Sequence, residues 1–499
     1  MTTGGMPSTS APARRWVLAL TSVASLMVVL DALVVSTALT TIRVHLGASV
    51  EELGWTVNAY TLSFAVLLMP AAAAGDRLGR RRVFTAGLGL FAAASAACAL
   101  ATGAGWLIAA RAVQGAGAAL VMPCALTLLS AAFPPPLRPK ALGMFTAVTG
   151  LAVPLGPLLG GAVVQGISWQ WIFWLNIPAG VVTIVLARAR IPESHGPAAA
   201  IDLPGLALVT GAAFAIVWGL VRGNEVGWGS AEVVSALTAG VLFTAGFAAW
   251  ELRAGAPMLP MRLFRSRAFS AGNAGMFFLW ASALGAVFFM AQFLQDGLHY
   301  GPLAAGLRLM PWGATTVLIP RLVGGLITRF GERPFLAAGL GLQAAGMTWI
   351  ALIAGPGLAY WHLVAPLVIS GAGVAMASPA AQSAVLSSSA PPDIGKASGA
   401  FSTMRQLGGA AGVAILVAVF GRAGSYASAQ AFTDGFAPAI GACAALSLTA
   451  PSPASPSPPG APLPAPAPRR RPRPFKPAPA HRPEPATHSR RTPRATSRW

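Results

Sequence analysis

The sequence predicts an all-α, multi-pass membrane protein with about fourteen transmembrane helices. Hydrophobic residues make up 55% of the 499 residues and charged residues only 10%, whereas about a quarter of a soluble domain is charged. Apolar runs of about 20 residues, which as helices cross a hydrocarbon core of roughly 30 Å, follow one another along the chain. A soluble protein can contain one or two such runs, but not a dozen in succession.

The expected helices cover almost the whole chain up to residue 450. The first run follows Arg14 and Arg15 like a signal peptide, but it is too long for one and contains Asp31, so we expect it to be retained. The last run has fifteen residues, which reach only about 22 Å, so we expect a truncated helix. The fourteen runs are 16–38, 52–74, 82–103, 106–130, 141–164, 170–188, 203–222, 231–250, 269–294, 303–325, 335–354, 361–386, 397–421 and 436–450.

Lys and Arg residues alternate between loops in a way that predicts the orientation of the helices. Cations are frequent before the first run and in every second loop after it, as in GDRLGRRRVF at 75–84, and they are rare in the other loops. Cytoplasmic loops of membrane proteins carry such an excess of Lys and Arg. We therefore expect a protein of the cytoplasmic membrane with both termini in the cytoplasm.

The chain contains an internal repeat. RLGRRRVF at 77–84 has a counterpart in RFGERPFL at 329–336, and VQGAGAALVMP at 113–123 matches ISGAGVAMASP at 369–379. A repeat in the same orientation at a near-constant offset predicts two halves related by an axis along the membrane normal. Each half supplies six helices, and the pair near 203–222 and 231–250 is inserted between them.

This repeat gives the expected domain organisation. It comprises a cytoplasmic segment over 1–15, a six-helix bundle over 16–190, two inserted helices with linkers over 191–267, a second bundle over 268–450 and a tail over 451–499. The tail is rich in Pro, Ala and Arg and has no core-forming pattern, so we expect it to be disordered. It begins within the expected last helix, which suggests a reading-frame shift or a recently acquired end.

Six motifs occur in a characteristic order. They are LDALVVSTAL at 30–39, WTVNAYTLSFAVLLMP at 55–70, GDRLGRRRVF at 75–84, RAVQGAGAAL at 111–120, GLAVPLGPLLGG at 150–161 and WQWIFWLNIPAG at 169–180. With these motifs the chain resembles the fourteen-helix drug:proton antiporter branch of the major facilitator superfamily, over residues 16 to about 445. The resemblance implies a secondary transporter for multidrug efflux and antibiotic resistance, which exports hydrophobic drugs, antibiotics or similar amphiphiles by alternating access.

Two of these motifs are candidates for controlling the conformational change. In GDRLGRRRVF, glycines permit a tight turn, and the acid and the arginines can pair with each other and with helix ends. The resemblance implies that this motif is a gating loop on the cytoplasmic side. In GLAVPLGPLLGG, small residues four apart allow close helix packing, and prolines kink the helix. The resemblance implies that this helix is typical of antiporters; the alternative is a helix that is only tightly packed. The gating residues are Gly75, Asp76, Arg77, Gly79, Arg80 and Arg81, and the antiport-helix residues are Gly150, Pro154, Gly156, Pro157, Gly160 and Gly161.

Asp31 and Arg111 are the candidates for proton coupling. Both lie inside apolar runs, where an ionisable side chain is costly and tends to face a cavity and a partner. Counting residues from the helix ends places both at a similar depth in the outer half of the membrane. We hypothesise that Asp31 binds and releases a proton as its neighbours change and that Arg111 favours its charged form. A static structural ion pair is the alternative.

The substrate cavity is less well defined by the sequence. Polar residues within the runs, among them Tyr60, Gln114, Gln292 and Gln406, are weak candidates for its lining. Apart from Asp31, no acid lies near the middle of an expected span. A neutral, singly cationic or anionic amphiphile is therefore more plausible than a divalent cation.

Three classes of function remain open at this point. The motifs favour a proton-coupled exporter, and the alternatives are an uptake symporter or facilitator and an inactive transporter remnant with an aberrant end. The sequence contains no nucleotide-binding Gly-Lys loop and no cluster of metal ligands, so we expect no enzymatic activity and no cofactor. The expected partners are a small hydrophobic or amphiphilic substrate, protons and the lipid bilayer, with no specific nucleic acid, and we expect a monomer.

Overall fold

The computed structural model describes residues 11–134, 136–196, 202–255, 257–390 and 393–450, and it confirms the all-α prediction. Thirteen segments are long and apolar enough to cross a membrane, and α13, with 21 residues, makes a fourteenth of membrane length. In chain order the helices are α1 (Ala11–Leu46), α2 (Val50–Leu78), α3 (Arg80–Ala99), α4 (Ala104–Ala132), α5 (Arg138–Gly150), α6 (Ala152–Gly166), α7 (Trp171–Trp174), α8 (Asn176–Arg190), α9 (Leu203–Val226), α10 (Ala231–Glu251), η1 (Met261–Arg265), α11 (Arg267–Gln292), η2 (Phe293–Gly297), α12 (Pro302–Arg308), α13 (Met310–Phe330), α14 (Glu332–Ile353), α15 (Trp361–Ser387), α16 (Ile394–Ala423) and α17 (Ala429–Leu448).

Two spans of the first half are broken at a residue that precedes a proline. The fifth span is divided into α5 and α6 at Leu151, and the sixth into α7 and α8 at Leu175. Pro154 and Pro178 each follow the break by three residues and have no backbone N–H to donate to the carbonyl four residues earlier.

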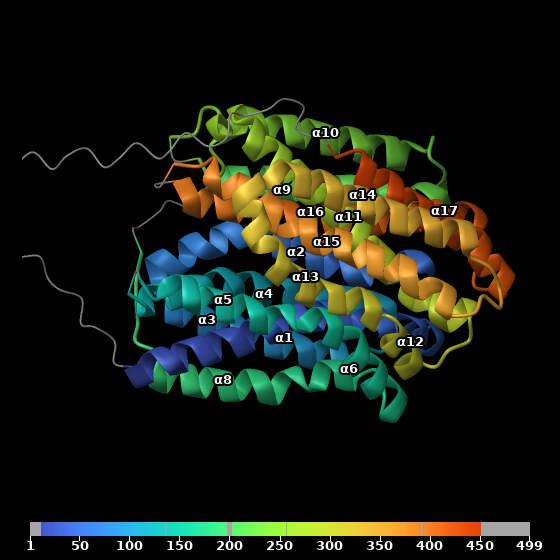
Figure 1. The fold of residues 1–499 in the computed structure, drawn as a ribbon, viewed down its shortest axis with the longest axis horizontal. Helices are drawn as coiled ribbons and strands as arrows, with labels where there is room; N and C mark the ends of the chain where they lie inside the picture. Colours follow the sequence, from blue (N-terminus) through green and yellow to red (C-terminus); the bar gives the residue numbers. More distant parts are fainter. Residues whose placement is uncertain (1–10, 135, 197–201, 256, 391–392, 451–499) are drawn as a thin grey trace, which may run out of the picture. The chain divides into compact units, whose positions relative to one another are not determined.

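The inserted helices lie beside the bundle rather than between its halves (Figure 1). The first of them, α9, packs against α2 and α16, whereas α10 contacts mainly α9. Much of the α10 surface is apolar and exposed, for example at Val241 and Leu242. An exposed apolar helix of this kind fits a location in contact with lipid.

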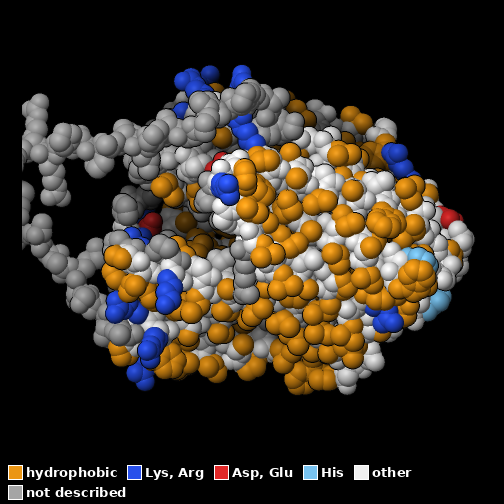
Figure 2. Space-filling model, viewed as in Figure 1, with side chains coloured by type: hydrophobic (Ala, Val, Ile, Leu, Met, Phe, Trp, Pro, Cys, Tyr) orange, Lys and Arg blue, Asp and Glu red, His pale blue; other side chains and the backbone are white. Residues whose placement is uncertain are grey.

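The two halves are joined at one side of the membrane and separated at the other. We call the side on which α1 begins and α2 meets α3 the basic side, because Lys and Arg side chains gather there in Figure 2. At the opposite side, α6 packs against α12, and the backbone N–H of Leu303 donates to Oε1 of Gln165 at 3.1 Å. Figure 2 shows the surface hollowed at the basic side. The conformation is therefore closed at the opposite side and open at the basic side.

The structure corrects two helix ends. The last helix begins at Ala429 and has 20 residues, so the expectation of a truncated fifteen-residue span is wrong. The Ser428 hydroxyl accepts from the backbone N–H of Ala431 and caps the helix before the apolar run starts. The first helix begins at Ala11, five residues before the expected first run and inside the expected cytoplasmic segment over 1–15. The remainder of that segment and the tail over 451–499 lie outside the described residues.

Candidate functional site

Asp31 and Arg111 form a buried ion pair between α1 and α4. Nη1 of Arg111 lies 2.5 Å from Oδ2 of Asp31, and each side chain is 1% exposed. The similar depths expected from the sequence thus correspond to direct contact. A charged hydrogen bond of this length is of the strong class, and it compensates two charges that the hydrocarbon region disfavours.

Amide and hydroxyl groups complete the surroundings of the carboxylate. Oδ1 of Asp31 accepts from Nδ2 of Asn176 at 2.7 Å and from Nε2 of Gln114 at 2.9 Å. The same Gln114 amide donates to the Ser95 hydroxyl at 2.8 Å, and its oxygen accepts from Nη1 of Arg111 at 2.6 Å. We call Asp31, Ser95, Arg111, Gln114 and Asn176 the polar cluster. It joins α1, α3, α4 and α8, so a change at Asp31 reaches four helices of the first half.

The arginine of the polar cluster is fixed by α2 as well. Nε of Arg111 donates to the carbonyl of Thr56 at 3.3 Å, and its guanidinium lies 4.2 Å from the centre of the Tyr60 ring. The Tyr60 hydroxyl donates to the carbonyl of Val28 on α1 at 3.1 Å. A cation over an aromatic face is stabilised by the electron density of the ring. Tyr60 therefore holds the arginine against α1.

This geometry determines what the carboxylate can do in the present conformation. Both Asp31 oxygens accept hydrogen bonds, Oδ2 from Arg111 and Oδ1 from Gln114 and Asn176. Adding a proton here would leave Arg111 buried without a counter-charge, which is strongly unfavourable. A proton could therefore bind this carboxylate only after a rearrangement that separates it from Arg111 or opens the cluster.

Four polar residues were expected to line a substrate cavity, and three of them are buried among other side chains. Tyr60, Gln114 and Gln292 are fully buried; the first two serve the polar cluster, and the third accepts from the Tyr426 hydroxyl and donates to the carbonyl of Phe288. In the described conformation these three side chains are therefore taken up by internal hydrogen bonds, as buried polar side chains nearly always are. Gln406 is half-buried on α16.

The gating-loop residues form a compact set of contacts at the basic side. Asp76 and Arg80 are ion-paired at 2.8 Å, and Gly79 has a φ of +108°, which a side chain rarely adopts. Gly75 packs against the sulfur of Cys124, Arg77 is exposed, and the Arg81 guanidinium donates to the carbonyl of Ile191 at 3.0 Å. These partners lie in the first bundle or, for Ile191, at the start of the linker that follows it, and none of them belongs to the second bundle.

Glu193, which the sequence analysis did not single out, secures the loop. Its carboxylate accepts from the backbone N–H groups of Arg81 at 2.8 Å and Arg82 at 3.2 Å, at the start of α3. Gly79, at the N-cap position, has no side chain to do so. Glu193 therefore caps α3 from a segment about 110 residues away in the chain.

We expect Glu193→Ala to lower the free energy of unfolding by about 1 kcal/mol, the usual cost of losing a helix cap. Thermal unfolding of the purified protein measures this effect. Glu193→Gln retains one acceptor oxygen and should fall between the wild type and the alanine variant. Equal stability of the wild type and Glu193→Ala would contradict this role.

The antiport-helix residues pack against both halves of the protein. A Cβ on Gly156 would lie 2.6 Å from Cβ of Leu33, and one on Gly160 would lie 2.4 Å from Oγ1 of Thr37, so these glycines permit contact with α1. A Cβ on Gly161 would lie 2.2 Å from the carbonyl oxygen of Pro302 in the second half. Close helix contact, expected from the spacing, is thus present.

The remaining residues of this motif have different surroundings. Glycines of the second half approach the backbone of Pro154 and Pro157, namely Gly313 and Gly306. A Cβ on Gly150 would meet nothing within 4 Å. The motif is therefore a contact surface between the halves from Pro154 to Gly161, and Gly150 lies outside it.

An ion pair joins the halves at the side opposite to the basic side. Nη2 of Arg43 on α1 lies 3.2 Å from Oδ1 of Asp296. The other carboxylate oxygen, Oδ2, accepts from the Thr40 hydroxyl at 2.9 Å. The guanidinium of Arg43 lies 4.0 Å from the centre of the Tyr426 ring. Both charged residues lie outside the apolar runs that the sequence predicts as spans.

We expect Asp296→Asn to favour opening at this side by about 1 kcal/mol, or roughly fivefold, because the pair is partly buried. A Thr37→Cys reporter, buried beside this contact, should then react faster with a membrane-impermeant maleimide. The charge reversal Arg43→Asp with Asp296→Arg should restore slow labelling. Unchanged labelling in Asp296→Asn would exclude a role in closure.

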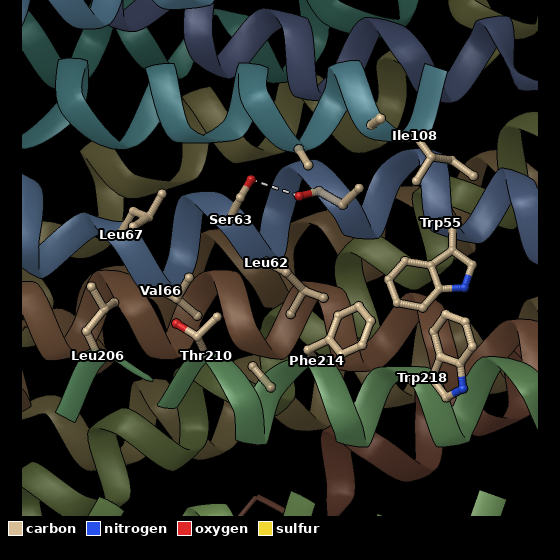
Figure 3. A pocket seen from close by; sticks show the side chains of 14 residues that line it. Trp55, Leu62, Ser63, Val66, Leu67, Ile108, Leu206, Thr210, Phe214 and Trp218 are labelled. Atoms are coloured by element: carbon tan, nitrogen blue, oxygen red, sulfur yellow. Dashed lines mark hydrogen bonds between the residues drawn. The ribbon is translucent and has the colours of Figure 1, made fainter. Parts of the chain in front are cut away.

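A cavity of about 530 Å³ lies between α2, α4 and the inserted α9. Figure 3 shows the rings of Trp55, Phe214 and Trp218 at one end of it, and its lining contains no charged residue. It shares α4 with the polar cluster, and its other wall includes α2, which contacts Arg111. On α2, Trp55 lines the cavity, whereas the carbonyl of the next residue, Thr56, accepts from Arg111. Its size and apolar walls are typical of sites for small hydrophobic ligands.

Comparison with known proteins places this geometry in a family context. Residues 21–413 match the Major Facilitator Superfamily. The chain is 33% identical to the tetracenomycin C resistance and export protein of Streptomyces glaucescens, over 82% of this chain and 77% of that protein. It is 36% identical to the cephamycin export protein CmcT of Amycolatopsis lactamdurans, over 86% and 89% of the two chains. It is 33% identical to the multidrug resistance protein Stp of Mycobacterium tuberculosis, over 79% and 73%.

Solved structures of the same fold are more distant in sequence. A POT family transporter in complex with 5-aminolevulinic acid superposes with a TM-score of 0.67 at 14% identity, over 89% of this chain and 97% of that chain. The nucleoside transporter NupG superposes with a TM-score of 0.60 at 13% identity, over 87% and 98%. These likenesses establish the arrangement of the helices.

Proposed function

Because the chain belongs to the major facilitator superfamily, we propose that it exports hydrophobic drugs, antibiotics or similar amphiphiles across the cytoplasmic membrane in exchange for protons. The observation that carries this proposal is the fully buried Asp31–Arg111 pair at the centre of the polar cluster. The cavity beside it and the relatives named for export of tetracenomycin C and of a cephamycin support a hydrophobic or amphiphilic substrate.

In this proposal the basic side faces the cytoplasm, in accordance with the excess of Lys and Arg there. The described conformation is then open to the cytoplasm, with Asp31 charged and able to balance Arg111. Closure at the basic side and release of the contacts between α6 and α12 expose the polar cluster to the exterior. A proton from outside then binds Asp31, and its release to the cytoplasm after the return step drives the cycle.

Efflux measurements test the proposal. Cells that produce the full chain are loaded with tetracenomycin C, a cephamycin or the dye Hoechst 33342, and retention is compared with cells that lack the protein, with and without a proton uncoupler. We expect lower retention of at least one compound and loss of the difference on uncoupling. Export that continues unchanged after uncoupling would rule out proton coupling.

A further inference from the structure

Arg405 on α16 is a second intramembrane cation, and it differs from Arg111 in having no acidic partner among the described residues. The ion pairs of the described chain involve other residues, and Nε of Arg405 is enclosed without a hydrogen-bond partner. Both oxygens of Asp31 are occupied by the polar cluster. Since a guanidinium remains charged at neutral pH, Arg405 carries a positive charge that no acid of the described residues pairs with.

A second unpaired donor lies beside it. The guanidinium carbon of Arg405 is 5.0 Å from the centre of the Trp280 ring on α11, and the indole N–H of Trp280 is also buried without a partner. Arg405 is eleven residues from the start of α16 and Trp280 thirteen from the start of α11. At 1.5 Å per residue both lie about 15–20 Å from these helix ends, near the middle of the membrane.

The other faces of α16 show where Arg405 is directed. Gly408 and Gly412 contact α11, the Thr403 hydroxyl donates to the carbonyl of Ala65 on α2, and Met404 lines a small groove toward α9. Arg405 and Gln406 are both half-buried. At 100° per residue, Arg405 lies beside Gly412 at the edge of the α11 face, and with Gln406 it covers the face of α16 between α11 and α2, away from α9. This face is directed toward the interior between the two halves.

We propose that Arg405 and Trp280 form a subsite that binds a carboxylate group of the exported compound. A guanidinium presents parallel N–H groups that match the two oxygens of a carboxylate, and the indole N–H supplies a further donor. An intramembrane ionisable side chain faces a partner or a cavity, and here the substrate provides the partner. The inference rests on the proposed export function and narrows its substrates to hydrophobic compounds that carry an acidic group.

Binding of two matched probes to the purified full-length protein in nanodiscs tests the proposal. The probes are 1-pyrenebutyrate, which carries a carboxylate, and 1-pyrenebutanol, which has the same ring system without the charge. Energy transfer from tryptophan to pyrene reports binding. The wild type should bind the carboxylate at least about tenfold more tightly than the alcohol. Arg405→Gln should remove this preference and leave binding of the alcohol unchanged.

Control variants separate the subsite from general effects of charge and folding. Arg422→Gln removes an exposed arginine that lies 5.3 Å from the Trp228 ring, near the end of the same helix, and it should keep the preference. Arg405→Lys should keep part of the preference for the carboxylate probe, and Trp280→Phe should weaken this preference a few-fold. If Arg405→Gln does not fold, these two variants test the subsite in its place. Failure of the wild type to prefer the carboxylate, or the wild-type preference in Arg405→Gln, would overturn the proposal. The assay needs no transport, so it is independent of whether export is coupled to protons.

Discussion

Replacing Asp31 with Asn is expected to reduce proton-driven export to the level of cells that lack the transporter. Asparagine has a similar shape but cannot take up or release a proton, so the cycle loses its coupling step. The substitution also leaves Arg111 buried without a counter-charge, and breaking a buried ion pair in this way typically costs about 3–5 kcal/mol of stability. Efflux of the exported compound, normalised to the amount of protein in the membrane, measures the effect.

The control for this experiment is the double variant Asp31→Asn with Arg111→Gln. It removes both charges, so the stability penalty of the isolated arginine disappears while the titratable group remains absent. We expect it to reach the membrane in normal amounts and still to lack proton-driven export. Uncoupler-sensitive export by the double variant would show that another residue carries the proton.

Gly161→Ala is expected to have the second largest effect, through the conformational equilibrium. The added Cβ would lie 2.2 Å from the carbonyl oxygen of Pro302, and both backbones must move to accommodate it. Overpacking of this kind costs about 1–3 kcal/mol. It should shift the equilibrium between the two conformations roughly 5- to 150-fold away from the one that is closed at the side opposite to the basic side. Export should fall accordingly, and the Thr37→Cys reporter should label faster.

Gly150→Ala is the matched control, because it makes the same change in the same motif at a position with open space around it. Alanine is the better helix former at both positions, so a difference between the two variants reports the contact between the halves. Near-normal export in Gly150→Ala together with loss in Gly161→Ala would support the account. Equal export by both variants would show that the close approach to Pro302 is not required.

The parts of this protein that the sequence predicts well are those set by local chemistry. Apolar runs of membrane length locate all fourteen long helices, since the bilayer fixes the length of a helix that spans it. The pairing of Asp31 with Arg111 follows from two intramembrane charges at similar depth. Gln114 follows Arg111 by three residues, so it lies on the same helix face. The sequence analysis thus identified two residues of the polar cluster, Asp31 and Arg111, and placed Gln114 with the weak candidates for the substrate cavity.

The remaining features depend on how distant segments pack. Ser95 and Asn176 reach the cluster through the packing of α3 and α8, which no local pattern indicates. Glu193 is recognisable only as an acid shortly after a helix, and its role as a cap appears once α3 is placed beside it. The apolar cavity beside Trp55 is enclosed only because the inserted helix α9 packs against α2 and forms the opposite wall. Arg405 did carry a local signal, an arginine inside an apolar run, and it was overlooked.

The most direct test of the central claim is the movement of protons in proteoliposomes that contain the purified full chain. The best exported compound of the cell assay is added to vesicles with a trapped pH indicator, and protons and compound are followed together. The account predicts that the compound and protons move in opposite directions with the wild type and that proton movement disappears with Asp31→Asn. Proton movement of the same size with Asp31→Asn would contradict the assignment of Asp31 as the coupling group.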